Sequence, residues 1–111
     1  MTLSPEQLDS YRRDGFLVVE GFVPAAACDR LRARMAELLE AFDPSGLATV
    51  FDTREQRYAQ DEYFLGSGDE VRFFLEPGAL DAEGRLGQAK ELSVNKVGHA
   101  LHDLDPVFDA F

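Results

Sequence analysis

The residues best suited to chemistry are concentrated in one stretch, residues 93–109, which reads SVNKVGHALHDLDPVFD. It contains both histidines of the chain, a lysine and several aspartates. Lys96 lies between Val94 and Val97, so its ammonium group is held beside apolar neighbours and outside any run of solvated charges. A cation in such surroundings requires an anionic partner, which either the protein or a ligand can supply. Residue type and spacing leave both possibilities open.

The two histidines must be tested as ligands of a non-haem iron site, which takes two histidines and one carboxylate. On a strand, two ligands lie two positions apart when they share a face, as in the motif His-x-Asp. The residues two positions after His99 and His102 are Leu101 and Leu104. We therefore expect no metal ligand and no catalytic residue in this chain. Both histidines are interpreted as hydrogen-bonding partners of nearby carboxylates or backbone groups.

Two backbone conformations compete for this stretch. Its apolar residues recur at helical steps of three and four, but a glycine and a proline interrupt them, and both are unfavourable inside a helix. Both objections disappear if residues 93–101 are extended and a short helix begins at Pro106, with Asp105 as its N-cap. We prefer this division, which places Lys96 and His99 on opposite faces of a strand.

The composition predicts one globular domain with an acidic surface, because the chain has 111 residues of which 45% are apolar. The net charge of −10 argues against nucleic acids and anionic membranes as partners. No apolar run approaches the roughly 20 residues of a membrane span, and Glu6 and Asp9 stand where a signal peptide would be basic. We therefore expect a cytoplasmic protein.

Two helices are predicted in the N-terminal part. The first has Ser4 as N-cap and Gln7 as the second member of a capping box, and runs to about Asp14. The second opens at Pro24 and runs to about Phe42. Its apolar face includes a cysteine at position 28, which we expect to be a small buried hydrophobe. Its opposite face is expected to be solvated and carries Asp29, Arg30, Arg34, Glu37 and Glu40.

Short strands are predicted from the remaining apolar runs. Residues 16–19 form a continuous apolar run that is typical of a strand covered on both faces, and residues 71–76 alternate as a strand. Residues 53–60 are expected to form a surface excursion, and residues 66–69 a plain turn. Together these elements predict an α+β fold in which two N-terminal helices pack on a few antiparallel strands.

Three blocks of the sequence are distinctive in combination: LSPEQLDSYRRDGFLVVEGF, EYFLGSGDEVRFFLEPGALDAEGRL and SVNKVGHALHDLDPVFDAF. Together they resemble the N-terminal part of the phytanoyl-CoA dioxygenase family, and within it the branch of phytanoyl-CoA dioxygenase domain-containing proteins. The resemblance implies an iron(II)- and 2-oxoglutarate-dependent hydroxylase built on a double-stranded β-helix, or jelly roll. Its iron is held by a His-x-Asp motif and a distal histidine. The resemblance also implies that Lys96 contacts 2-oxoglutarate.

Other parts implied by the resemblance do not occur in this sequence. Family members are more than twice as long, and the resemblance places their iron ligands beyond position 111. We therefore expect residues 1–111 to form a single partial domain that binds neither iron nor 2-oxoglutarate tightly. We also expect the reading frame to continue past Phe111, and the complete enzyme to act on a small-molecule substrate. The alternative is a stand-alone acidic protein-interaction module that keeps this scaffold without catalysis.

Overall fold

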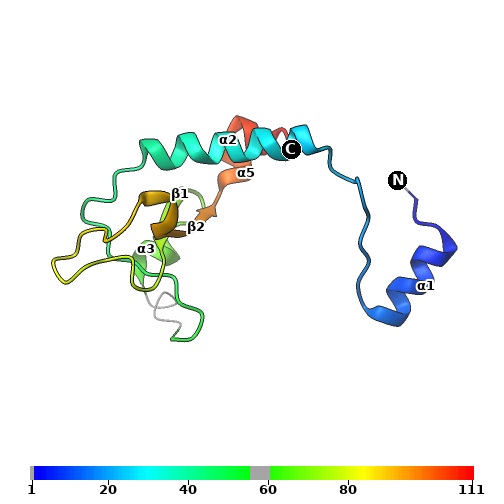
Figure 1. Ribbon diagram of the computed structural model, residues 1–111, viewed down its shortest axis with the longest axis horizontal. Helices are drawn as coiled ribbons and strands as arrows, with labels where there is room; N and C mark the ends of the chain where they lie inside the picture. Colours follow the sequence, from blue (N-terminus) through cyan, green and yellow to red (C-terminus); the bar gives the residue numbers. More distant parts are fainter. Residues whose placement is uncertain (1, 56–60) are drawn as a thin grey trace.

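The computed structural model describes residues 2–55 and 61–111, so part of the excursion predicted at 53–60 lies outside the described residues. The described chain combines helices with one antiparallel strand pair (Figure 1), which confirms the α+β class. The elements are α1 (Pro5–Asp14), α2 (Ala25–Ala41), α3 (Glu62–Leu65), β1 (Val71–Leu75), α4 (Lys90–Ser93), β2 (Val94–His99), α5 (Leu101–Leu104) and α6 (Pro106–Asp109).

Helix α1 begins and ends where local chemistry predicts. The Ser4 hydroxyl accepts a hydrogen bond from the backbone N–H of Gln7 at 3.2 Å, and the Gln7 side chain accepts one from the backbone N–H of Ser4 at 2.8 Å. Gly15 ends the helix with φ of 79°, a left-handed conformation that glycine adopts without steric cost. The predicted capping box and helix end are both confirmed.

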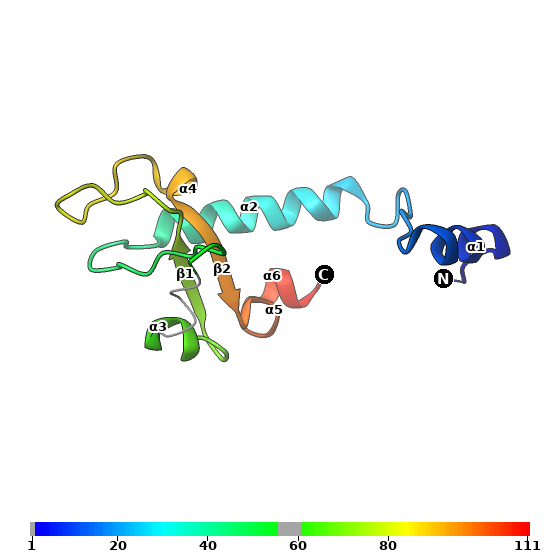
Figure 2. The same cartoon turned by 90° about the horizontal axis from the view of Figure 1, so that it is seen from below.

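The strand predicted at residues 16–19 is wrong. This segment has no regular structure, and Phe16 and Val18 are 66% and 70% exposed. Both views place α1 and the segment that follows it apart from the rest of the chain (Figures 1 and 2), so the predicted packing of α1 on the strands is also wrong. An apolar run forms a strand only when another strand pairs with it, and no described segment does so here.

The separation of α1 makes the molecule elongated. Its Cα radius of gyration is 18.0 Å, whereas a compact domain of this length has about 13 Å. None of the described helices is both long and apolar enough to cross a bilayer.

Helix α2 lies beside the strand pair in both views (Figures 1 and 2), and its bounds agree with the prediction to within one residue. Its C-terminal carbonyls would lack partners without help from elsewhere. The Lys90 ammonium group, from α4, donates to the carbonyl oxygens of Glu40 at 2.6 Å and Phe42 at 2.9 Å. Cys28, predicted to be a small buried hydrophobe, is half-buried.

Strands β1 and β2 are antiparallel, as expected, and β1 contains the largest fully buried side chains of the described residues. Phe74 and Leu75 of β1 are fully buried, and Phe74 lies opposite Lys96 of β2. The neighbouring Phe73 stacks on Phe42, with ring centroids 4.2 Å apart and 13° between the planes. This stacked pair fixes the C-terminal end of α2 against the strands.

The division of the last stretch into a strand and a short helix from Pro106 is confirmed, but the strand is shorter than the predicted 93–101 and a helical turn that was not predicted, α5, lies between the two. Asp105 is the N-cap of α6, and its carboxylate accepts hydrogen bonds from the backbone N–H groups of Val107 and Phe108. The same carboxylate accepts a hydrogen bond from Arg34 Nε at 2.7 Å. Arg34 was expected on a solvated helix face. That expectation is wrong because its long side chain reaches across to the buried Asp105.

Candidate functional site

The Lys96 ammonium group lies over two aromatic rings. Its Nζ atom is 4.8 Å from the ring centroid of Phe51 and 5.3 Å from that of Phe64. At these distances the negative faces of the rings attract the cation. Gly98 leaves room for the lysine's carbon chain, since a Cβ atom at that position would lie 3.4 Å from Lys96 Cε.

Backbone hydrogen bonds bring both rings to the lysine. The N–H of Phe51 donates to the carbonyl oxygen of Leu75 at 2.8 Å, so the segment that contains Phe51 runs along β1. Phe64 belongs to α3, which Asp61 caps by accepting a hydrogen bond from the N–H of Tyr63 at 2.7 Å. Sequence reasoning did not assign either phenylalanine to the site. The sequence did contain one signal for the short helix α3, namely Asp61, an N-cap residue type, directly before the helix.

Lys96 forms no ion pair with any residue that the structure describes, although it is half-buried. The contrast with Lys90 is direct, because two backbone carbonyls already accept hydrogen bonds from that ammonium group. The three N–H donors of Lys96 therefore remain available to an anion.

His99 lies against the same aromatic ring as Lys96, which the predicted alternation of faces did not allow. Its ring centroid is 5.0 Å from that of Phe64, edge to face at 89°. Its Nδ1 atom lies 2.6 Å from the hydroxyl oxygen of the fully buried Ser67. Placement of Lys96 and His99 on opposite faces is therefore wrong. Burial and the nearby Lys96 cation lower the pKa of His99 below its ordinary value.

The two histidines do not converge on one point. His102 is exposed on α5 and lies 3.4 Å from the Asp103 carboxylate, whereas His99 contacts Ser67 within the aromatic cluster. Within residues 2–55 and 61–111, no group of three or more histidine, cysteine or acidic side chains is arranged to hold a metal ion.

Asp105 connects α2 and α6. It is 5% exposed, and its burial opposes ionisation. Hydrogen bonds from Arg34 and from two backbone N–H groups outweigh that effect, so the pKa of Asp105 lies below its ordinary value. The carboxylate is thus held charged at the junction that follows β2.

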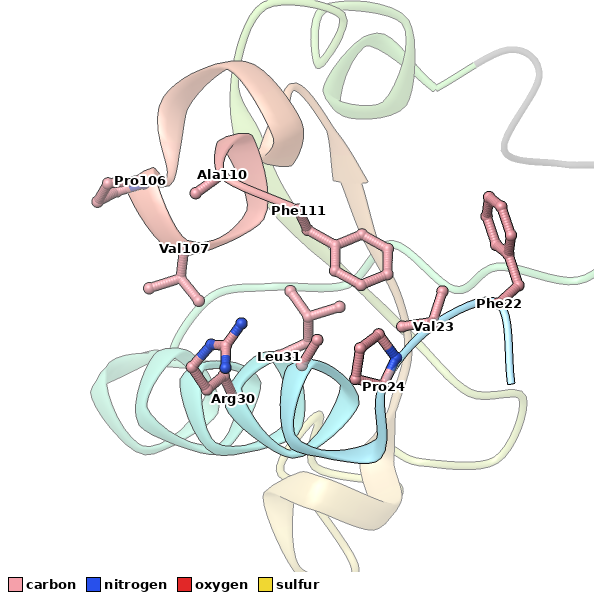
Figure 3. Close-up of a pocket in the computed structure, with 10 residues that line it drawn as sticks. Phe22, Val23, Pro24, Arg30, Leu31, Pro106, Val107, Ala110 and Phe111 are labelled. Atoms are coloured by element: carbon pink, nitrogen blue, oxygen red, sulfur yellow. The ribbon is translucent and has the colours of Figure 1, made fainter. Parts of the chain in front are cut away.

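A separate cavity of about 660 Å³ lies between the start of α2 and helix α6 (Figure 3). Apart from Arg30, its lining is apolar and includes Leu31, Val107 and Phe111. None of the residues around Lys96 lines it. The lysine site and this cavity are therefore distinct features.

Comparisons with a family model and with known proteins point to the same family. The family model described as phytanoyl-CoA dioxygenase (PhyH) matches residues 11–111. A phytanoyl-CoA dioxygenase domain-containing protein 1 homolog from Dictyostelium discoideum is 42% identical over 111 residues, which cover 100% of this chain and 39% of that protein. A phytanoyl-CoA dioxygenase from Arabidopsis thaliana is 44% identical, covering 99% and 38%.

A similar match is found to the phytanoyl-CoA dioxygenase domain-containing protein 1 of Bos taurus, at 44% identity over 96% of this chain and 38% of the relative. The chain thus spans about two fifths of the length of these relatives. Since the family model covers nearly the whole sequence, the chain belongs to the phytanoyl-CoA dioxygenase family and corresponds to its N-terminal part.

Proposed function

We propose that this chain forms the N-terminal part of an iron(II)- and 2-oxoglutarate-dependent dioxygenase, and that Lys96 binds a carboxylate of 2-oxoglutarate. Family membership supports the dioxygenase scaffold. The observation that carries the role of Lys96 is its ammonium group, which lies over Phe51 and Phe64 without a carboxylate partner among the described residues.

The described residues do not fit an iron centre. His99 is hydrogen-bonded to Ser67 and packed against Phe64, while His102 stands next to Asp103 on an exposed helix. No third ligand lies near either histidine within the described ranges. We therefore assign no residue of this chain to the metal and derive no step through it.

The surroundings of Lys96 do fit a carboxylate. An ammonium–carboxylate hydrogen bond is charge-assisted, and nearby aromatic rings exclude water and so strengthen it. When bound, 2-oxoglutarate supplies electrons for the reduction of dioxygen through its own decarboxylation. The role of Lys96 is to bind and orient one carboxylate and to balance its charge.

The substrate and the cellular location are also inferences. We infer a small-molecule substrate from the family, and the charge of −10 opposes binding to nucleic acids or anionic membranes. We place the protein in the cytoplasm on the sequence features given above.

The role of Lys96 is tested in a protein of the relatives' length that carries this chain as its N-terminal part. Lys96→Ala should weaken 2-oxoglutarate binding by about 10- to 100-fold, the value of one charge-assisted hydrogen bond, with the melting temperature nearly unchanged. Lys90→Ala is the matched control, because the ammonium group of that lysine donates to the backbone carbonyls of Glu40 and Phe42. It should lower stability and leave affinity intact. Equal loss of affinity in both variants would make Lys96 a structural residue.

The exposed apolar side chains near the N-terminus favour a second candidate, a protein-interaction module without catalysis. Tyr11, Phe16, Val18 and Phe22 are all more than half exposed. The reading frame beyond Phe111 separates the two functions. A His-x-Asp motif within a few dozen codons supports the dioxygenase, whereas a stop codon in the intact gene supports the module.

A further inference from the structure

We propose that His99 is a positioning residue for the anion site, because it fixes the Phe64 ring beneath the Lys96 ammonium group. This inference rests on the proposed function, in which Lys96 binds a carboxylate. His99 itself need not touch the ligand. Its contacts with Ser67 and Phe64 carry the proposal.

The hydrogen bonds of Ser67 determine which nitrogen of His99 carries the proton. The Ser67 hydroxyl donates its single hydrogen to the carbonyl oxygen of Phe64 at 2.5 Å. Its oxygen must therefore accept from His99 Nδ1, 2.6 Å away. The result is a chain of two hydrogen bonds from the imidazole to the backbone of the residue whose ring lies beneath Lys96.

The ring of Phe64 is held on more than one side. His99 meets it at a centroid distance of 5.0 Å and an angle of 89°, and Phe74 meets it at 5.4 Å and 64°. Phe74 is fully buried and His99 lies 5.8 Å from it, so the three rings form one cluster. The Lys96 Nζ atom lies 5.3 Å from the centroid of the Phe64 ring.

A fixed ring beneath the ammonium group favours anion binding through preorganisation. Lysine has a flexible four-carbon stem, and ordering that stem when a ligand binds reduces affinity. The attraction of the cation to Phe64 and Phe51 restricts the stem beforehand. Loss of the support from His99 should therefore loosen both the ring and the lysine.

Two substitutions separate the contacts of His99. His99→Asn keeps a side-chain N–H donor for Ser67 but removes the ring from Phe64, and His99→Phe keeps a ring but removes the donor. Lysine labelled with ¹³C gives a direct readout, because Lys90 and Lys96 are the two lysines in the sequence. In the wild type, ring currents should shift the Lys96 Hε signals upfield of those of Lys90.

The expected result is that both variants move the Lys96 signals towards those of Lys90 and weaken the response to 2-oxoglutarate by about three- to fivefold, with His99→Asn more affected. The Lys90 signals should stay in place. The spectra are recorded at low temperature, so that a destabilised variant stays folded during the measurement. Lys96 signals and affinities equal to wild type in both variants would overturn the role of His99 alone. A wild-type Lys96 signal that 2-oxoglutarate does not move would count against the proposed function itself.

Discussion

At the scale of single residues, the two lysines differ in what their ammonium groups contact. Lys90 bonds to the carbonyl oxygens of Glu40 and Phe42, while Lys96 lies over aromatic rings with no ion pair to a described residue. The first contact closes the C-terminus of α2 and suits the negative end of its dipole. The second leaves hydrogen-bond donors available, and only the second therefore suggests a ligand.

Substitution of Lys90 should affect stability. Lys90→Met removes two hydrogen bonds at the end of α2 and should lower the melting temperature by roughly 5 °C. Lys96→Met should change it by less, since that ammonium group makes only contacts with rings among the described residues. Thermal denaturation followed by circular dichroism measures both. A larger decrease of the melting temperature in Lys96→Met than in Lys90→Met would contradict this assignment, because Lys96 would then be the lysine with the main structural role.

The lowered pKa of His99 predicts the direction of a pH effect on stability. The folded chain binds a proton at His99 less readily than the unfolded chain, in which the pKa is near 6.5. The free energy of unfolding should therefore be greatest above pH 6.5 and fall as the pH drops from 6.5 through the folded-state pKa.

Urea denaturation at about pH 7.5 and about pH 5.5 tests this effect. The wild type should lose more stability between the two values than His99→Phe, which cannot be protonated. Asp105 and Glu70, whose pKa values are also lowered, titrate in a more acidic range and should affect both proteins alike. An identical loss in the two proteins would contradict the pKa direction given for His99.

At the scale of the elements, one carboxylate links two parts of the chain. Asp105 caps α6 and receives a hydrogen bond from Arg34 of α2. Arg34→Met removes the link to α2 together with the ion pair between Arg34 and Glu37, and it leaves the cap in place. Asp105→Ala removes both the link and the cap. The two variants therefore separate the functions of this residue.

We expect Asp105→Ala to lower the melting temperature more than Arg34→Met, by roughly a further 5 °C. The reason is that Asp105→Ala leaves two backbone N–H groups of α6 without their partner, whereas Arg34 keeps its hydrogen bond to Glu37. Thermal melts of the two single variants and the double variant measure the interaction between the residues. Equal shifts for both single variants would mean that the cap contributes nothing.

Elements with local signals were predictable from sequence. The Ser4 capping box and the Asp105 N-cap followed by proline each specify their own geometry. The strand at β1 was predicted, but its alternation of faces was wrong, because the register shifts between Phe74 and Leu75 and both side chains are fully buried. The strand predicted at residues 16–19 was wrong, because pairing with a second strand decides whether an apolar run becomes a strand. The position of Lys96 in β2 was predicted, but its rings were not. Phe51 and Phe64 reach it through backbone contacts with β1 and through a single helical turn that has no periodicity to detect.

At the scale of the whole molecule, the N-terminal arm, residues 2–23, stands apart from the strand pair. Both views show α1 separated from the remaining elements (Figures 1 and 2). An isolated helix of 10 residues is marginally stable in water, even with a good cap. The arm therefore contributes little to the stability of the part that carries Lys96.

Hydrogen exchange should reveal this difference in stability. Amides of α1 should exchange close to the rate of an unstructured peptide, while amides in β1 and β2 should be protected. Deletion of residues 1–23 should leave the melting temperature within a few degrees of wild type. Protection of α1 equal to that of the strands would contradict an independent arm.

The central claim is that Lys96 is the residue of this chain that meets 2-oxoglutarate. The most direct measurement is a titration of the ¹³C-lysine-labelled chain with 2-oxoglutarate, with its uncharged diethyl ester as the control ligand. Because this chain alone is expected to bind 2-oxoglutarate only weakly, the titration extends to millimolar concentrations. The account predicts that 2-oxoglutarate moves the Lys96 signals and leaves those of Lys90 unchanged, while the ester moves neither. Equal movement of both lysines, or no movement of Lys96 at any concentration, would contradict it.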